Sequence, residues 1–237
     1  MDDDRILLAH GGGGALTREL VEELIVPALG GAGDALPDAS PLPGADDMLL
    51  TTDAFVVKPL FFRGGDIGCL SVYGSVNDLA VSGAEPIALA MSLVIEEGLE
   101  MDVLKRVLAS AAAAARGCGV RVVTGDTKVV ARDDADQLYV TTAGVGRKVL
   151  SVGPGGLRAG DRLILSGVVG DHGIAVMSER EGIDFETDVR SDCASVWPLV
   201  RTLAETGVGV HAMRDPTRGG LAAACVELAD ASGMSVE

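Results

Sequence analysis

Apolar residues in this chain fall into short runs and helical stripes separated by glycine- and proline-containing turns. Continuous apolar runs predict buried strands at Met48–Asp53, Ile87–Ile95, Arg121–Val130 and Gln137–Val145. Apolar residues at helical spacing predict helices from about Asp66 to Val81 and from Met101 to Gly117 or Gly119. A short strand at Ile6–Ala9, a glycine loop, a helix with Thr17 as its N-cap and a long loop over Gly30–Asp47 are expected to precede them. The pattern is typical of a mixed α/β fold.

A second α/β segment is expected after the Gly/Pro-rich link at Ser151–Gly160. We place the boundary there, with one domain over residues 1–152 and a second over 153–237. Strands are predicted at Arg162–Ser166 and Val208–Met213, and helices are predicted up to Glu181, from Asp192 and after the N-cap Thr217. A second domain built from so few elements would be small and partly uncovered.

Composition and charge exclude several classes of protein. The 237 residues are 48% hydrophobic, which argues against a disordered chain. A formal net charge of −16 argues against nucleic acid and anionic membranes as partners. The N-terminus does not have the form of a signal peptide, and no apolar run approaches the ~20 residues of a membrane span, so a cytoplasmic protein is expected. The four cysteines have no metal-site spacing, which favours buried free thiols over zinc.

Polar residues recur where predicted strands and helices end. Asp53 ends a strand, Asn77 and Asp78 interrupt an otherwise apolar helix face, and Asp126 and Lys128 lie together in a Gly/Thr context. Each has an ordinary structural explanation: Asp53 can form a turn, Asp78 can be a solvated helix position, and Asp126 with Lys128 can be a surface ion pair. Arg218, before the last predicted helix, can likewise be a solvated side chain.

Taken together, these residues favour a magnesium–phosphate site without a P-loop. Hard carboxylate oxygens suit Mg²⁺, which commonly bridges a few acids to substrate phosphates. Lys128 and Arg218 would then contact the phosphate itself. No Gly-Lys-Ser/Thr follows the glycine run His10–Gly14, and Leu16 stands where a dinucleotide fingerprint needs glycine. The candidate metal ligands are Asp38, Asp53, Asp78 and Asp126.

Several longer strings make a family resemblance specific. LAHGGGG, TTDAFVVKPLFFRGGDIGCLSVYGSVNDLA, VVTGDTKVV, GDHGIAV, SDCA and MRDPTRGGLA occur in this order over essentially the whole chain. Together they resemble the hydrogenase maturation factor HypE, a carbamoyl dehydratase. That family belongs to the superfamily of aminoimidazole ribonucleotide synthetase, selenophosphate synthetase and thiamine-monophosphate kinase. The segment His10–Ala15 has no reactive Cys with a Lys, which counts against the selenophosphate synthetases.

The resemblance implies an α+β, PurM-like fold of two α/β halves, the C-terminal half being incomplete in this chain. The N-terminal half would contribute strands to a barrel shared between the subunits of a homodimer. ATP and Mg²⁺ would bind between the halves. Catalytic roles would fall to Lys128 and Asp126, with Lys128 as a candidate base or phosphate clamp. The nucleotide contacts would come from Asp38, Asp53, Asn77, Asp78, Thr127, Asp215, Thr217 and Arg218.

The resemblance also implies a reaction and its partners. In that family a C-terminal cysteine receives a carbamoyl group from the carbamoyltransferase HypF. ATP activates the amide oxygen as a phosphate ester, and loss of phosphate leaves an S-cyanated cysteine. The cyano group then passes through a HypC–HypD scaffold complex to the iron of a [NiFe] hydrogenase.

One departure from the family keeps alternatives open. The family continues into a tail that ends in the acceptor cysteine, whereas Cys225 lies inside the last predicted helix. The chain is therefore expected to be a truncated form or a shortened relative that does not turn over by itself. The alternatives are a non-catalytic dimer module that binds nucleotide or maturation partners, and another ATP-dependent synthetase or kinase of the superfamily.

Overall fold

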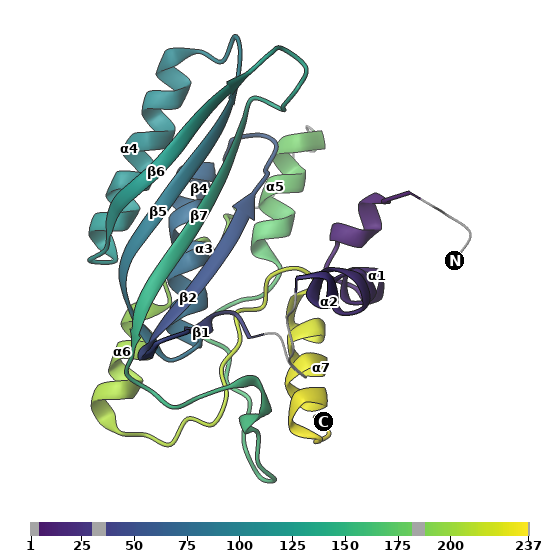
Figure 1. Cartoon of the computed structure of the whole chain (residues 1–237), viewed down its shortest axis with the longest axis vertical. Helices are drawn as coiled ribbons and strands as arrows, with labels where there is room; N and C mark the ends of the chain where they lie inside the picture. The colour runs from purple at the N-terminus through teal and green to yellow at the C-terminus, as the bar shows by residue number, and fades with distance from the viewer. Residues whose placement is uncertain (1–4, 30–36, 182–187, 237) are drawn as a thin grey trace. The chain divides into compact units, whose positions relative to one another are not determined.

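The computed structural model describes residues 5–29, 37–181 and 188–236. The chain divides into two compact units (Figure 1). The larger unit comprises Asp38–Ser151 and Leu163–Val210, and the smaller one comprises Met1–Pro37, Val152–Arg162 and His211–Glu237. Residues 163–210 thus belong with the sheet that precedes them. The boundary between residues 152 and 153 remains a prediction.

The larger unit is built on a five-stranded sheet in the order β1–β2–β7–β5–β6. The strands are β1 Ser40–Leu42, β2 Ala45–Phe55, β7 Leu138–Lys148, β5 Ala84–Glu96 and β6 Arg121–Val130. Only β5 and β6 run parallel, and α4 (Met101–Gly117) makes the crossover between them. All four strands predicted in this half are confirmed. Strands β2, β5 and β7 extend beyond the apolar runs from which they were predicted.

Helix α3 (Ile67–Val81) packs on β2, β5 and β7 and on α4, so both helices cover the same face of the sheet (Figure 1). The predicted helix from about Asp66 is confirmed, and Asp66 is its N-cap. The Asp66 side chain accepts hydrogen bonds from the backbone of Gly68 at 2.7 Å and Cys69 at 3.2 Å. Leu79 of α3 and Leu89 of β5 are fully buried in the core between this helix and the sheet.

Polar groups inside this interface are satisfied by one another. The Thr142 hydroxyl of β7 lies 2.7 Å from the Ser75 hydroxyl of α3 and donates to the Ser71 carbonyl at 3.1 Å. All three residues are fully buried. Such paired groups avoid the desolvation cost of an unmatched buried hydroxyl and fix the position of α3 on the sheet.

Several expectations about loops and strands were wrong because strands depend on distant partners. Part of the predicted loop over Gly30–Asp47 forms β1 and the start of β2, which pair as a hairpin around Gly44 with φ +83°; residues 30–36 lie outside the described ones. Neither 162–166 nor 208–213 forms a strand, and Ile164 is 89% exposed. Among the described residues no strand pairs with either segment. Without a neighbouring strand, an apolar run has no sheet hydrogen bonds for its backbone N–H and C=O groups and so does not form a strand.

The remaining helices of the larger unit are α5 Asp171–Glu181 and α6 Trp197–Thr206, and its second sheet pairs β3 Phe61–Phe62 with β4 Gly65–Asp66. The helix predicted from Asp192 therefore begins at Trp197 instead. Asn77 of α3 explains the delay, because its side chain donates to the Ala194 carbonyl at 3.0 Å and accepts from the Val196 amide at 2.9 Å. These bonds hold the backbone of this segment outside a helix.

The smaller unit contains short helical segments and one longer helix. They are η1 Leu8–Gly11, α1 Ala15–Glu19, η2 Leu20–Ile25, α2 Val26–Ala28, η3 Pro154–Gly156 and α7 Gly220–Ser232. The predicted strand at Ile6–Ala9 is wrong, because η1 takes up most of it. Ser232 of α7 ties η3 in place by donating to the Pro154 carbonyl at 3.1 Å and accepting from the Leu157 amide at 3.2 Å. Throughout the described part of the chain no helix has the length and apolar character of a membrane span.

Candidate functional site

The Thr51 hydroxyl links two of the predicted acids. Thr51 is on β2 and 5% exposed, and its Oγ1 is 2.9 Å from the Asp78 Oδ2 of α3 and 2.9 Å from the Asp38 carbonyl oxygen. A hydroxyl carries one hydrogen and donates to one of these oxygens at a time. Asp38 is further fixed by its neighbour, since the Ala39 amide donates to Ser82 at 3.0 Å, just after α3 ends.

Asp53 belongs to the same group because residues 51 and 53 share one face of β2. A β-carbon added to Gly74 of α3 would lie 3.4 Å from the Asp53 Oδ2, so this carboxylate faces the helix. Gly74 and Asp78 are four residues apart, on one side of α3. The Asp53 Oδ1 accepts from the Ala54 amide at 2.8 Å. The structure therefore brings Asp38, Asp53 and Asp78 together at the interface of β2 and α3.

Asn77 has a different environment from its neighbour Asp78. Its side chain is 8% exposed and uses both its donor and its acceptor on the backbone of residues 194 and 196. In this arrangement Asn77 holds a chain segment against α3 rather than presenting its amide to solvent.

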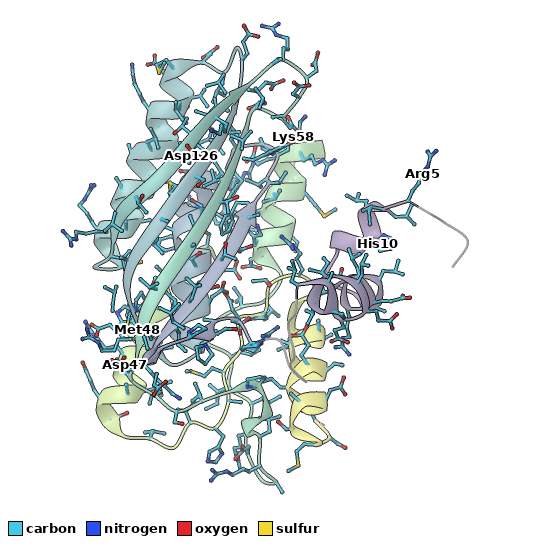
Figure 2. All side chains as sticks on the ribbon, viewed as in Figure 1. Arg5, His10, Asp47, Met48, Lys58 and Asp126 are labelled. Carbon is cyan, nitrogen blue, oxygen red and sulfur yellow. The ribbon has the colours of Figure 1, made fainter. Side chains whose placement is uncertain are left out.

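Asp126, Thr127 and Lys128 are not brought to this acid group. They lie on β6, where Figure 2 labels Asp126. Strands β7 and β5 lie between β6 and β2, which puts β6 about 14 Å from β2 at normal strand spacing. Lys128 Nζ is 3.6 Å from Asp126 Oδ2, and the two side chains are 71% and 65% exposed. An exposed pair of this kind contributes under about 1 kcal/mol to stability, so the fold does not depend on this ion pair.

Asp215, Thr217 and Arg218 belong to the smaller unit, where Arg218 lies next to the N-terminal glycine run. A β-carbon on Gly13, whose φ is +78°, would meet Arg218 at 2.5 Å, so the two segments are in close contact. The prediction of Thr217 as N-cap is wrong: α7 begins at Gly220 with Gly219 as N-cap. Gly219 and Gly220 have φ of +80° and +62°, and this left-handed turn delays the helix.

The acids of the β2/α3 interface fit Mg²⁺ chemically but not as a complete cage. Their donors are carboxylate and carbonyl oxygens, the ligands that this ion prefers. Among the described residues no three His, Cys, Asp or Glu side chains are close enough to hold a metal by themselves. Mg²⁺ commonly takes one or two carboxylates and completes its octahedron with phosphate and water, so a partial set is adequate.

Thr51 is the residue that sequence reasoning missed. Its signal was present, because it lies two residues before Asp53 in a strand and therefore on the same face. A second omission concerns Cys69 and Cys193, which were expected to be buried free thiols but are only partly buried. Their sulfur atoms are 4.0 Å apart, a proximity that spacing along the chain gives no means of finding.

Comparisons with known proteins identify the family of the chain. The family model "AIR synthase related protein, N-terminal domain" matches residues 36–148, and the C-terminal domain model of the same family matches residues 158–237. Carbamoyl dehydratase HypE of Cupriavidus necator is 44% identical over 98% of this chain and 68% of its own length.

Two solved structures extend the likeness to the fold. One is described as a crystal structure of a HypE–HypF complex, with a TM-score of 0.85 and 42% identity over 93% of this chain and 71% of that chain. The other is described as HypE in complex with ATP, with a TM-score of 0.77 and 42% identity over 96% of this chain and 69% of that chain. On this evidence the chain, which spans about two thirds of these relatives, belongs to the HypE carbamoyl dehydratase family.

Proposed function

We propose that this chain acts in [NiFe]-hydrogenase maturation as the ATP-dependent carbamoyl dehydratase part of its protein. The reaction would convert a cysteine S-carboxamide to an S-cyanide, with ATP taking up the amide oxygen as phosphate. The observation that carries the proposal is the grouping of Asp38, Asp53 and Asp78 around Thr51, in a chain 42% identical to a HypE described with bound ATP. HypF as partner is supported by the related HypE–HypF complex; the HypC–HypD complex and a cytoplasmic location remain predictions.

Mg²⁺ would be held by Asp38, Asp53 and Asp78 and would supply charge neutralisation at the ATP phosphates. Without a cation, the acids of the β2/α3 interface, in a chain of net charge −16, would repel an incoming nucleotide. Lys128 is proposed to take the amide proton during loss of phosphate, or to hold the phosphate, and Asp126 to orient it. Asp215, Thr217 and Arg218 are proposed as further nucleotide contacts.

Replacing Asp78 with asparagine tests the site directly. The change removes one charge but preserves shape, so ATP affinity in the presence of Mg²⁺ should fall on the order of tenfold or more, because charge-assisted contacts are worth about 1.5 kcal/mol or more. Isothermal titration with ATP, with and without Mg²⁺, measures the loss. Asp102→Asn is the matched control, since Asp102 is 84% exposed and pairs only locally with Lys105. Equal Mg-dependent affinity in the Asp78 variant and the control would contradict the site.

We also propose that two copies of the chain pair through β6. This strand lies at the edge of the sheet, and three of its valines, Val122, Val123 and Val129, are 43%, 58% and 69% exposed. Exposed apolar edges are sites of pairing with another chain, and closure into a barrel removes the edge.

Light scattering after size exclusion tests this pairing. The native chain should have the mass of a dimer, and Val123→Lys should shift it to a monomer, because a charge would be buried in the new interface. Val226→Lys on α7 provides the control, since this valine is also half exposed, at 51%. A monomeric native chain, or a Val123→Lys variant that stays dimeric, would show that the edge is not the interface.

A further inference from the structure

Two cysteines 124 positions apart in the sequence face each other in the larger unit. The Sγ atoms of Cys69 and Cys193 are 4.0 Å apart. Cys69 is the third residue of α3, and its sulfur also lies 3.3 Å from both the backbone nitrogen and the carbonyl of Asp66. Neither cysteine is fully buried. A disulfide bond is about 2 Å long, so the sulfurs need to approach by only about 2 Å.

The chain segment that carries Cys193 is held in place from both sides. Before it, the Ser191 amide donates to the Arg63 carbonyl at 2.8 Å, and the Ser191 hydroxyl is 2.9 Å from His172 Nδ1. After it, Asn77 holds the backbone of Ala194 and Val196. The facing of the two sulfurs therefore results from a fixed backbone rather than from a chance side-chain orientation.

The two thiols differ in reactivity in a way that suits disulfide exchange. The hydrogen bond from Cys193 lowers the pKa of Cys69 to about 6, and its position in the first turn of α3 also favours a thiolate. The neighbouring Cys69 raises the pKa of Cys193, and burial raises the pKa of Cys118. At neutral pH the attacking sulfur is thus Cys69, with Cys193 beside it as the resolving thiol.

We propose that Cys69 and Cys193 form a redox-active dithiol whose disulfide fastens residues 191–196 to the start of α3. The oxidant is a small-molecule disulfide of the glutathione type. The Cys69 thiolate attacks one of its sulfurs and displaces one thiol as a mixed disulfide forms. Cys193 then loses its proton, attacks the Cys69 sulfur and displaces the second thiol. The protein loses two electrons and two protons, and the oxidant becomes two thiols.

This inference does not rest on the proposed dehydratase activity, because neither thiol is among the candidate ATP or metal residues. Of those candidates it uses Asn77 alone, and only for its hydrogen bonds to the backbone after Cys193. It nevertheless concerns the same helix, since α3 carries Cys69 near its start and Asn77 and Asp78 near its end. Oxidation would add a covalent link to a segment that Asn77 otherwise holds by two hydrogen bonds.

Treatment of the folded, fully reduced chain with glutathione disulfide at pH 7, followed by acid quenching and peptide mapping by mass spectrometry, tests the proposal. We expect the loss of two hydrogen atoms, a single linkage between the peptides of Cys69 and Cys193, two remaining free thiols and full reversal by dithiothreitol. The same reaction in urea should lose this selectivity, because the pairing depends on the fold.

Single variants separate the two roles. Cys193→Ala should stop at a glutathione adduct on Cys69, and Cys69→Ala should leave Cys193 at least tenfold slower to react. Cys118→Ala and Cys225→Ala are the matched controls and should oxidise as the native chain does. Four unreacted thiols in the folded native chain, adducts without a link, or a link that includes Cys118 or Cys225 would each overturn the proposal.

Discussion

Replacing Gly68 with alanine is expected to lower the free energy of unfolding of the larger unit by roughly 3 kcal/mol. Gly68 is in the first turn of α3, where a β-carbon would overlap the Val107 carbonyl of α4 and lie 3.1 Å from the Ala111 amide. Backbone atoms of a packed helix do not move aside as a flexible side chain does. Helices α3 and α4 would therefore have to separate, and this loss exceeds the ~1 kcal/mol by which alanine is otherwise the better helix former.

Trp197 provides the measurement, because it is the single tryptophan and is buried at the start of α6 in the larger unit. Urea unfolding followed by its fluorescence should show a lower midpoint for Gly68→Ala. Gly117→Ala at the end of α4 is the matched control, since nothing lies within 4 Å of its β-carbon position, and its midpoint should be unchanged or slightly higher. Equal midpoints for both variants would mean that α3 and α4 are not this close.

Replacing Lys128 with methionine is expected to slow dehydration about 10²–10⁴-fold while leaving ATP affinity and stability unchanged. The change removes the proposed base, whereas the exposed ion pair with Asp126 contributes little to folding. The assay is a single turnover with ATP and a synthetic peptide ending in S-carbamoyl cysteine. Phosphate release and the mass of the cyanated peptide are followed together.

Lys105→Met is the control for this experiment. The Lys105 side chain is 68% exposed against 71% for Lys128. Lys105 contacts an acid three residues before it, as Lys128 contacts one two residues before it. A rate for Lys128→Met equal to that of the control would remove Lys128 from the chemistry. A loss of ATP affinity that accounts for the slower rate would instead assign Lys128 to phosphate binding.

Local signals in the sequence were sufficient for most of the larger unit. Apolar residues at helical spacing predicted a helix from about Asp66, and the structure explains this start by the Asp66 side chain, which caps amides only two and three residues away. The apolar runs predicted the four long strands for the same reason. The strands expected at 162–166 and 208–213 failed, because apolar character does not supply the partner that a strand needs.

For the candidate site, too, the sequence identified residues and the fold decided which of them meet. Residue types and the family resemblance were enough to single out Asp38, Asp53 and Asp78. Their grouping around Thr51 depends on the packing of α3 against β2, which joins positions 27 residues apart. The placement of Asp126 and Lys128 on an edge strand follows from the strand order β2–β7–β5–β6, which is not the order along the chain.

The sequence by itself determined the family, the acidic and basic residue types from which the candidate site is drawn, and the helices and strands that local periodicity encodes. Only the tertiary structure decided which side chains meet: Thr51 with Asp78, Asn77 with the backbone after Cys193, and Cys69 with Cys193 itself. The physical reason is range. Capping and hydrophobic periodicity act over a few residues, whereas these contacts form only after sheet pairing and helix packing have joined distant parts of the chain.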